Sequence, residues 1–347
     1  MRLEDLGWDA SFSSAFEPFE RAGLRPGRIS RTDRRSFRVL TGQDELHAEV
    51  SGKLRYHTPE WPVTGDWVVL RGDSPVIDTV LPRKTELSRK TAGEQTGKQV
   101  LAANVDVLFL VTGLDRDFNP RRIERWLLLA GECGAQPVIV LNKADLHPDP
   151  DWAAGEVRQL APAVPVTVVS ALAEQGAAEL IRHVRHGETA ALVGSSGVGK
   201  STIVNWLLER DAQLTQEVRK DDGRGRHTTT SRELIPMPGG WLLMDTPGLR
   251  ELQLWAGEDS LDQTFEDVAN FAAMCRFRDC RHEGEPGCAV TEAVSGGDLD
   301  EARLGSYRKL QRELAYLARR QDEWAAAEEK RRWKRIHKAM RQGGKRL

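Results

Sequence analysis

Hydrophobic and polar positions change their spacing near residue 100, and the region before this point shows only short apolar runs. Between residues 25 and 90 these runs are separated by Gly and Asp, and the spacing of a long helix is missing. Such a pattern predicts short strands at residues 37–40, 47–54, 66–71 and 75–81. The length and spacing favour a small antiparallel barrel of the oligonucleotide-binding (OB) kind, although an SH3-like barrel would give a similar pattern.

Beyond residue 100 the apolar runs become continuous, which is typical of parallel strands buried on both faces. The runs are DVLFLVTGL at residues 106–114, PVIVL at 137–141, PVTVV at 165–169 and TAALV at 189–193. Helical patterns at residues 121–134 and 173–185 lie between them, and residues 241–244 supply another strand. Alternating strands and helices predict a three-layer α/β domain.

The patterns together predict a multidomain α/β protein. After residue 253 the chain becomes helical, with an apolar stripe formed by Tyr307, Leu310, Leu314 and Leu317. The predicted division is an N-terminal extension at residues 1–24, a barrel at 25–90, the α/β domain at 91–253 and a helical C-terminal domain at 254–347.

Charge is distributed unevenly along a chain whose net charge is only −2. Residues 301–347 contain 15 Lys or Arg against 6 Asp or Glu. A basic tail on a nearly neutral protein indicates a polyanionic partner, although a solvated helix face would look the same. Arginines also crowd the barrel entrance, where phosphate contacts and ordinary surface solubility are the two interpretations: Arg21, Arg25, Arg28, Arg31, Arg34, Arg35 and Arg38.

The N-terminus gives no indication of export or membrane insertion. Residues 1–14 lack the charged-then-apolar pattern of a signal peptide, and no apolar run approaches the length that spans a bilayer. We therefore expect a cytoplasmic protein without membrane contact. We also expect a monomer, since the sequence shows no pattern typical of an oligomer interface.

Residues 194–201 match the phosphate-binding pattern G-x-x-x-x-G-K-[ST] between an apolar strand and a predicted helix. Glycines let consecutive backbone N–H groups point at phosphates, and the helix N-terminus adds positive potential. Lys200 is expected to reach the β- and γ-phosphates, and the Ser201 hydroxyl to ligate Mg²⁺. The predicted contacts are Gly194, Ser195, Ser196, Gly197, Val198, Gly199, Lys200, Ser201 and Thr202.

The tetrapeptide N-K-A-D at residues 142–145 follows a buried strand and indicates that the base is guanine. The Asp145 carboxylate can accept hydrogen bonds from guanine N1 and N2, a pair of donors that adenine lacks. Such a site rejects the wrong base by roughly 10⁴-fold or more, because its own polar groups would be left unpaired. Around Asp145, the predicted base contacts are Asn142, Lys143, Ala144, Ser170 and Ala171.

The order of these two motifs is inverted, because N-K-x-D normally follows the phosphate loop. The inversion predicts a circularly permuted nucleotide-binding domain. A third motif, D-T-P-G at residues 245–248, again follows a strand. Asp245 is expected to hold Mg²⁺ through water, and the Gly248 N–H to sense the γ-phosphate.

A switch loop is predicted at residues 223–231 (GRGRHTTTS), which are rich in glycine and hydroxyl groups. One of three consecutive threonines, residues 228–230, is expected to complete the Mg²⁺ shell, and Thr229 is favoured. Leu249 occupies the position where many GTPases have Gln, so another residue must orient the attacking water. His227 is the nearest candidate, the alternative being a loop histidine bonded to its own backbone. The predicted catalytic residues are therefore Lys200, His227 and Thr229.

Three of the four cysteines lie within 14 residues, beside a histidine: Cys275, Cys280, His282 and Cys288. Three thiolates and one imidazole suit a tetrahedral Zn²⁺, and a full set of protein ligands indicates a structural site. Three buried thiols and a surface histidine are the alternative. The surrounding segment is polar and has little apolar surface to bury. Metal binding contributes on the order of 10–16 kcal/mol in zinc peptides, which would offset the entropy cost of ordering this segment.

Together these residues resemble the RsgA (YjeQ) family of circularly permuted GTPases. The resemblance is carried by N-K-A-D before G-S-S-G-V-G-K-S, by G-R-H-T-T-T and by C-R-F-R-D-C-x-H-x₅-C. It extends from P-V-x-G-D-W at residues 62–67 to the basic tail. It implies an N-terminal OB-fold, a permuted GTPase domain and a C-terminal zinc-binding domain.

The resemblance also implies a function and its partners. The family hydrolyses GTP to GDP and phosphate, is stimulated by the 30S subunit, and acts in late 30S maturation in contact with 16S rRNA. Its zinc ligands fall on the cluster at residues 275–288, and its catalytic histidine falls on His227.

The residues themselves leave two other functions open. One is a passive RNA-binding scaffold in which the nucleotide is structural and hydrolysis vestigial. The other is a kinase or phosphatase of a small metabolite, which the phosphate loop alone permits but which N-K-x-D and the switch threonines disfavour.

Overall fold

The computed structural model of the chain describes residues 1–20, 22–33, 36–57, 61–72, 75–90, 98–115, 118–216, 232–237, 239–245, 258–316 and 319. The chain divides into two compact units. The first comprises Met1–Ser88 with Val100–Leu252, and the second comprises Arg89–Gln99 with Gln253–Leu347. The four-part division made from the sequence stays a prediction.

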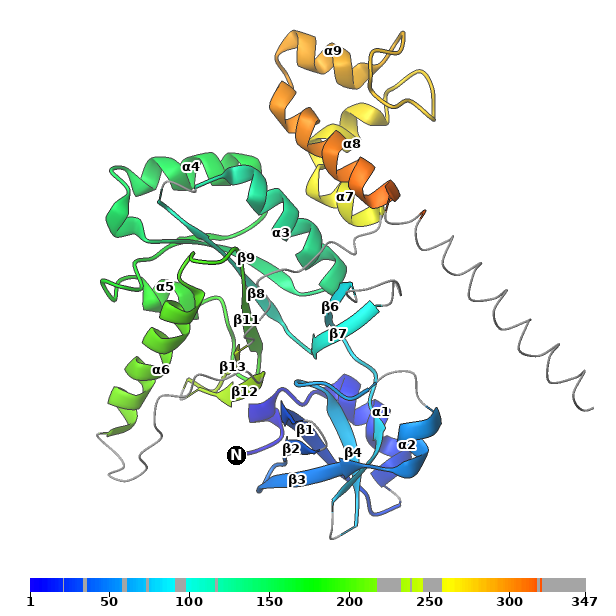
Figure 1. Cartoon of the computed structure of the whole chain (residues 1–347), viewed down its shortest axis with the longest axis vertical. Coiled ribbons are helices and arrows are strands. Elements are labelled where there is room, and N and C mark those ends of the chain that lie inside the picture. Colours follow the sequence, from blue (N-terminus) through cyan, green and yellow to red (C-terminus); the bar gives the residue numbers. More distant parts are fainter. Residues whose placement is uncertain are drawn as a thin grey trace, which may run out of the picture. The chain divides into compact units, whose positions relative to one another are not determined.

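A closed five-stranded barrel forms the N-terminal part of the first unit (Figure 1). The strands pair in the order β1-β2-β3-β5-β4, and β4 also pairs with β1; only β3 and β5 run parallel. This closed barrel, with a helix between its third and fourth strands, is the predicted OB-fold. Its elements are β1 (Arg25–Thr32), β2 (Phe37–Leu40), β3 (Glu45–Val50), α2 (Gly52–His57), β4 (Trp67–Arg71) and β5 (Val76–Val80).

One predicted barrel strand ends early. The strand expected at residues 47–54 ends at Val50, because helix α2 begins at Gly52 instead. The Ser51 hydroxyl oxygen accepts a hydrogen bond from the Leu54 N–H at 3.1 Å, which is the usual bond of an N-cap residue.

The first 20 residues, which the sequence left unassigned, pack on the barrel. They form a 3-10 helix at Glu4–Leu6 and helix α1 (Ala10–Glu20). Trp8 and Phe12 lie with their ring centroids 4.7 Å and 5.7 Å from that of Trp67, which is fully buried at the start of β4. This aromatic group belongs to the same hydrophobic core as the sheet of the α/β part.

Arg28 joins three segments of the first unit. Its side chain is only 1% exposed, and it donates hydrogen bonds to the carbonyl oxygens of Leu6 (2.5 Å), Gly65 (3.2 Å) and Asn104 (2.8 Å). Burial lowers the pKa of Arg28 to about 10, so the guanidinium stays charged at neutral pH. This arginine is therefore an internal structural residue, and the phosphate contact considered for it from the sequence is wrong.

Replacing Arg28 with methionine should lower the free energy of unfolding of the first unit by about 3–5 kcal/mol, because three buried carbonyls lose their donor. Arg25, exposed on the same strand, supplies the matched control, and Arg25→Met should cost less than about 1 kcal/mol. Denaturant unfolding of the two variants checks the difference. Equal costs would contradict the structural role of Arg28.

The α/β part contains a six-stranded sheet in the order β10-β9-β8-β11-β13-β12. The first five strands are parallel, and β12 is antiparallel to β13. β12 also pairs with β1 through Arg31 and Glu233, so the sheet continues into the barrel. The strands are β8 (Val107–Gly113), β9 (Gln136–Asn142), β10 (Val166–Val168), β11 (Thr189–Val193), β12 (Glu233–Pro236) and β13 (Leu242–Asp245).

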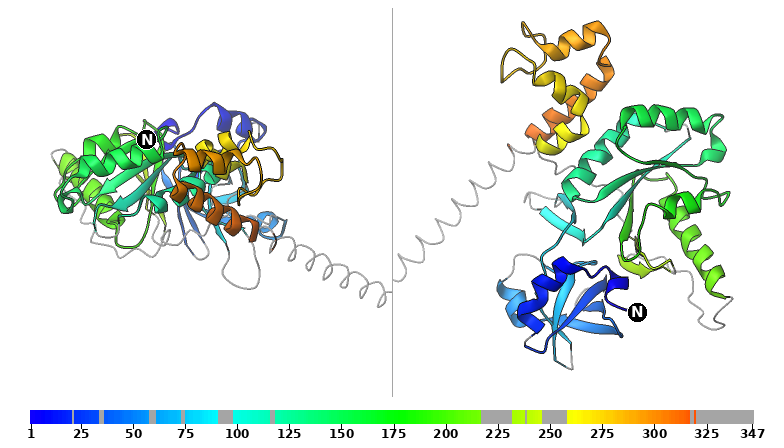
Figure 2. Two further views of the ribbon diagram at one scale, coloured as in Figure 1. Left: turned by 90° about the horizontal axis from the view of Figure 1, so that it is seen from above. Right: turned by 180° about the vertical axis from the view of Figure 1, so that it is seen from behind.

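Helices cover both faces of this sheet and make the predicted three layers (Figures 1 and 2). Alternate residues of β8 face opposite sides: Leu108 packs in the core with α3 and α4, and Phe109 in the core with α5 and α6. The helices are α3 (Pro120–Cys133), α4 (Pro150–Leu160), α5 (Ala177–Ile181) and α6 (Lys200–Gln216).

Helix α5 is shorter than the predicted helix at residues 173–185. Ser170 and Gln175 form an isolated β-bridge that holds the intervening residues in a turn. Gly176, with φ of 90°, then precedes the helix, so that α5 begins only at Ala177.

The second unit is helical in its described C-terminal part. It contains α7 (Glu258–Thr264), α8 (Glu266–Ala272), α9 (Ala289–Gly296) and a helical segment at residues 301–316. Strands β6 (Glu86–Lys90) and β7 (Lys98–Ala103) form a separate two-stranded sheet where the two units meet in the sequence. Among the described residues, no helix is long and apolar enough to cross a membrane.

Candidate functional site

The predicted nucleotide-binding motifs all follow parallel strands of one sheet. The phosphate loop follows β11, N-K-A-D begins at the end of β9, Ser170 follows β10, and Asp245 ends β13. The carboxyl ends of parallel strands meet at one edge, which is where open α/β sheets bind ligands. The sheet thus brings the motifs to one edge although their order along the chain is inverted.

Two glycines of the phosphate loop are required by close backbone approach. A Cβ on Gly194 would lie 2.2 Å from the Val111 carbonyl oxygen, and one on Gly199 would lie 2.2 Å from Asn142 Nδ2. Both glycines also have positive φ, 150° and 96°. The loop therefore lies against the ends of the neighbouring strands β8 and β9.

Lys200 begins helix α6 and curls back over the loop. Its Nζ donates to the carbonyl oxygens of Gly194 and Ser195 at 2.7 Å and 2.6 Å. The ammonium group is thereby held at the mouth of the loop. The remaining predicted phosphate contacts that are exposed around it are Ser196, Gly197, Ser201 and Thr202.

Asn142 connects three loops of the site. Its Nδ2 donates to the Val198 carbonyl oxygen in the phosphate loop at 2.9 Å, and its Oδ1 accepts from the Ala171 N–H at 3.1 Å. The side chain is 2% exposed, so both bonds are made in a protected environment. The base-reading and phosphate-binding segments are therefore in direct contact.

The base-reading residues Lys143 and Asp145 each have a partner. Lys143, in the left-handed region at φ 64°, places its Nζ 2.6 Å from Asp115 Oδ2. The Asp145 carboxylate accepts a hydrogen bond from the Ser170 hydroxyl and is itself exposed. The Ala144 N–H donates to the Val169 carbonyl at 3.2 Å, which fixes the loop to the end of β10.

Asp115 is a site residue that the sequence reasoning missed. Two residues after β8, it lies at the same sheet edge as the recognised motifs, and this position was its one available signal. The Asp115 carboxylate binds the Lys143 ammonium group and so holds the aliphatic part of this side chain in a fixed direction beside the base-reading loop.

Asp245 and Ser201 have the chemistry to hold Mg²⁺, which prefers oxygen ligands. Burial raises the pKa of Asp245, and the Glu233 carboxylate paired with it across β12 and β13 raises it further. A bound cation would counter both effects. His227, Thr229 and Gly248, predicted for catalysis, Mg²⁺ and the γ-phosphate, lie outside the described residues.

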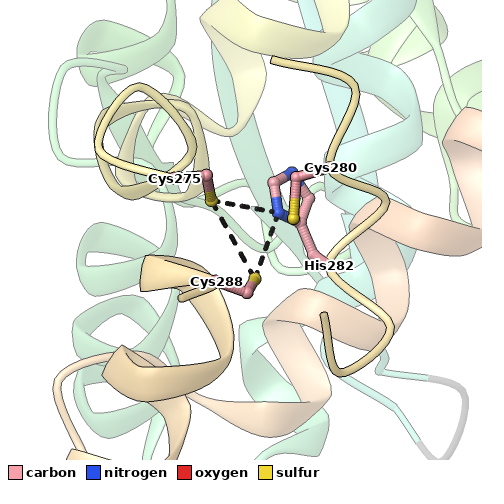
Figure 3. Close-up of side chains that lie close together, drawn as sticks. All are labelled: Cys275, Cys280, His282 and Cys288. Carbon is pink, nitrogen blue, oxygen red and sulfur yellow. Dashed lines mark hydrogen bonds between the residues drawn. The ribbon is translucent and has the colours of Figure 1, made fainter. Parts of the chain in front are cut away.

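The second candidate site is a cluster of three cysteines and one histidine, whose ligand atoms all lie within 4.8 Å of one another. Figure 3 shows the four side chains pointing to a common centre. Cys275 Sγ lies 3.9 Å from Cys288 Sγ, and His282 Nδ1 lies 3.6 Å and 3.5 Å from these sulfurs. Tetrahedral ligands with metal–sulfur bonds of about 2.3 Å have sulfurs about 3.8 Å apart, so the cluster fits one metal ion.

The chain around the cluster is arranged to hold it. Cys288 is the N-cap residue of α9, and His282 adopts a left-handed φ of 60° that turns its ring inward. Burial opposes ionisation of Cys288, but hydrogen bonds from Thr291 and His282 outweigh it and lower the pKa of this thiol. Burial and the neighbouring thiols Cys288 and Cys275 raise the pKa of Cys280. A thiolate is the form that binds metals.

The comparison with known protein families settles the class of the chain. The family model described as RsgA GTPase matches residues 80–255. A curated relative from Opitutus terrae is 47% identical over 98% of this chain and 97% of its own length. The chain belongs to the RsgA GTPase family. That relative is named small ribosomal subunit biogenesis GTPase RsgA, and so is one from Streptomyces coelicolor, 45% identical over 96% of this chain and 92% of its own.

Solved structures agree with the family. The crystal structure of YjeQ from Thermotoga maritima has a TM-score of 0.65 and 28% identity, covering 84% of this chain and 99% of that one. YloQ, described as a circularly permuted GTPase, has a TM-score of 0.61 and 26% identity, covering 84% and 95%. The resemblance stated from the sequence, the permuted GTPase fold and the assignment as a GTP-hydrolysing enzyme are all confirmed.

Proposed function

We propose that this member of the RsgA GTPase family acts in late maturation of the 30S subunit, where it binds 16S rRNA and hydrolyses GTP when the subunit stimulates it. Asn142 carries the nucleotide part of the proposal, because it bonds the phosphate loop to the base-reading side although the motifs are inverted in sequence. The names of the relatives, small ribosomal subunit biogenesis GTPase, support the partner. We further propose a cytoplasmic monomer.

The residues at the sheet edge divide the work on GTP. The Asp145 carboxylate accepts from the guanine ring, and Lys143, held by Asp115, covers it. Lys200 leaves the loop carbonyls for the β- and γ-phosphates, whose charge replaces those contacts. We assign the orientation of the attacking water to His227.

Mg²⁺ in this site would be held by Ser201, Thr229 and Asp245. When bound it neutralises charge on the phosphates. The Gly248 N–H is assigned to the γ-phosphate. The segment after β13 would therefore lose a contact when GTP is hydrolysed.

We assign Zn²⁺ to the cluster at residues 275–288. Three thiolates and an imidazole with this spacing match zinc, and four protein ligands leave no position open for a substrate. The metal is therefore structural, and the second unit depends on it for its fold.

GTP hydrolysis measured with and without purified 30S subunits tests the proposal. The subunit should raise the rate, and Lys200→Ala should abolish hydrolysis under both conditions, because the phosphates lose their main cation. Arg158→Ala, exposed on α4, serves as the surface control and should behave as wild type.

The same experiment separates the enzyme from a scaffold with vestigial hydrolysis. If 30S subunits leave the wild-type rate unchanged, the proposed function fails. If Lys200→Ala still supports 30S maturation in cells lacking the wild-type protein, the scaffold is the better description.

A further inference from the structure

The turn between two cluster ligands, Cys275 and Cys280, exposes an aromatic ring. Phe277 is 45% exposed, and Met274, immediately before the first ligand, is 64% exposed. Large apolar side chains are usually buried, and aromatic rings left in water on a fixed backbone are enriched at binding surfaces. Nothing in the metal cluster requires a phenylalanine at this position.

The backbone that carries Phe277 is held from several sides. The Arg276 N–H donates to the Gly287 carbonyl at 3.1 Å, and the Cys280 N–H donates to the Phe277 carbonyl at 3.3 Å. Both ends of the turn reach cluster ligands. The ring is thus presented by a preorganised loop, which lowers the conformational entropy lost when a partner binds.

Three arginines of the same loop are exposed: Arg276, Arg278 and Arg281. The Arg276 guanidinium carbon lies 5.5 Å from the Phe277 ring centroid. Within the described part of the chain, no carboxylate forms an ion pair with any of the three side chains. Their charges therefore remain available to a partner.

Three acidic residues of the same loop balance this charge in number: Asp279, Glu283 and Glu285. Glu285 accepts from the backbone N–H groups of Arg281 and Glu283 at 2.8 Å and 2.7 Å, and these bonds leave its charge in place. Asp279 and Glu283 are exposed. The loop therefore combines an exposed aromatic ring with three guanidinium groups that form no ion pair with these acids.

We propose that Phe277 is a stacking platform for an unpaired RNA base, and that Arg276, Arg278 and Arg281 contact the flanking phosphates. Aromatic faces stack on any base, and planar guanidinium groups match phosphate geometry. A paired base offers no free face, so the ligand is single-stranded or bulged RNA. A protein partner would need more apolar area than Phe277 and Met274 supply.

This inference rests on the proposed function, because it takes RNA as the partner, and it names the site and the form of that RNA. The test uses the full-length, metal-loaded protein and a fluorescein-labelled single-stranded RNA of about 16 nucleotides and mixed sequence. Fluorescence anisotropy should show Phe277→Ala and Phe277→Leu binding roughly 10- to 100-fold more weakly than wild type, while Phe277→Tyr stays within about twofold.

Two further measurements make the test specific. A duplex RNA of the same length should bind Phe277→Ala and wild type equally. Phe277→Ala should leave the slope of log affinity against log salt unchanged, whereas Arg278→Gln should reduce it by about 1, because a phosphate contact and its released counterion are lost.

Tyr316→Ala is the matched control, since Tyr316 is 53% exposed on the helical segment of the same unit. It should bind RNA as wild type, and metal analysis should find every variant loaded. The platform is refuted if Phe277→Ala binds the single-stranded RNA as tightly as wild type. It is also refuted if Phe277→Ala weakens duplex and single-stranded RNA binding equally, or if Tyr316→Ala loses as much affinity as Phe277→Ala.

The outcomes separate this inference from the proposed function. If Phe277→Ala binds the single-stranded RNA normally while 30S subunits still stimulate GTP hydrolysis by wild type, only the platform is refuted. If Phe277→Ala loses affinity for 30S subunits but not for the strand, the ring contacts a protein and the platform is again refuted. If 30S subunits do not stimulate GTP hydrolysis by wild type, the proposed function is refuted, but the measured affinities for single-stranded RNA still test the platform.

Discussion

Replacing Asp145 with asparagine should change the base preference of this GTPase from guanosine to xanthosine triphosphate. The carboxylate accepts from both guanine N1–H and the N2 amino group. An asparagine amide would instead place its own N–H donor against the N2 amino group, which is also a donor. Xanthine carries a carbonyl there, which can accept a hydrogen bond from the amide of the substituted side chain. We expect GTP affinity to fall roughly 10³- to 10⁴-fold, and xanthosine triphosphate to bind more tightly than to wild type.

Asp149→Asn is the matched control for this substitution. Asp149 is exposed four residues further on, and its carboxylate accepts from the Trp152 N–H at 2.9 Å as the N-cap of α4. Asparagine caps helices as well as aspartate does, so folding and base preference should stay as in wild type. Competition between labelled GDP and the two triphosphates measures the preference, and an unchanged preference in Asp145→Asn would remove this residue from the base site.

The same competition assay tests the metabolite kinase or phosphatase that the phosphate loop alone permits. ATP should fail to compete with GTP in wild type, because adenine offers no pair of donors to Asp145. Equal competition by ATP would revive that alternative and remove the main argument for a guanine site.

The α/β part of the fold could be predicted because its strands are buried on both faces. Continuous apolar runs are rare outside such strands, and they placed β8, β9 and β11 within a residue or two. The motifs follow these strands directly, so their gathering at one sheet edge needed no further information.

The barrel was harder to predict because its first strand is defined by tertiary contacts. β1 carries arginines at Arg25, Arg28 and Arg31, which resemble a solvated surface in sequence. Arg28 is nonetheless buried, because three carbonyls from distant segments satisfy its donors. No local pattern shows that those carbonyls will be there. β12 was missed for a related reason, since it is a short strand placed by its pairing with β1 and β13.

The N-terminal helix did carry a signal that was overlooked. Trp8, Phe12 and Phe16 are spaced four residues apart, which is the spacing of one helix face. Their burial against Trp67 follows from that spacing once the barrel is present. Asp115 differs, because its role depends on Lys143, 28 residues away, and only the packing of β8 beside β9 brings the two together.

Removing the metal should unfold the second unit while leaving the first unit able to bind GTP. Metal coordination contributes on the order of 10–16 kcal/mol in zinc peptides, which equals or exceeds the whole stability of a typical domain. The described helices of this unit bury a small core around Phe265, which is 0% exposed, and the loop that bears the cluster is polar. Cys280→Ala, or a chelator on wild type, should therefore abolish protection from amide hydrogen exchange in the second unit.

Cys133→Ala distinguishes this effect from the loss of any buried thiol. Cys133 is 4% exposed in the core of the first unit, where burial raises its pKa to about 11 and keeps it a neutral, unreactive thiol. We expect this variant to retain about one metal ion per chain and full exchange protection of the second unit, at a cost of about 1 kcal/mol in the first. If Cys280→Ala instead loses the metal but keeps its exchange protection, then apolar packing alone holds the second unit and the cluster is not structural.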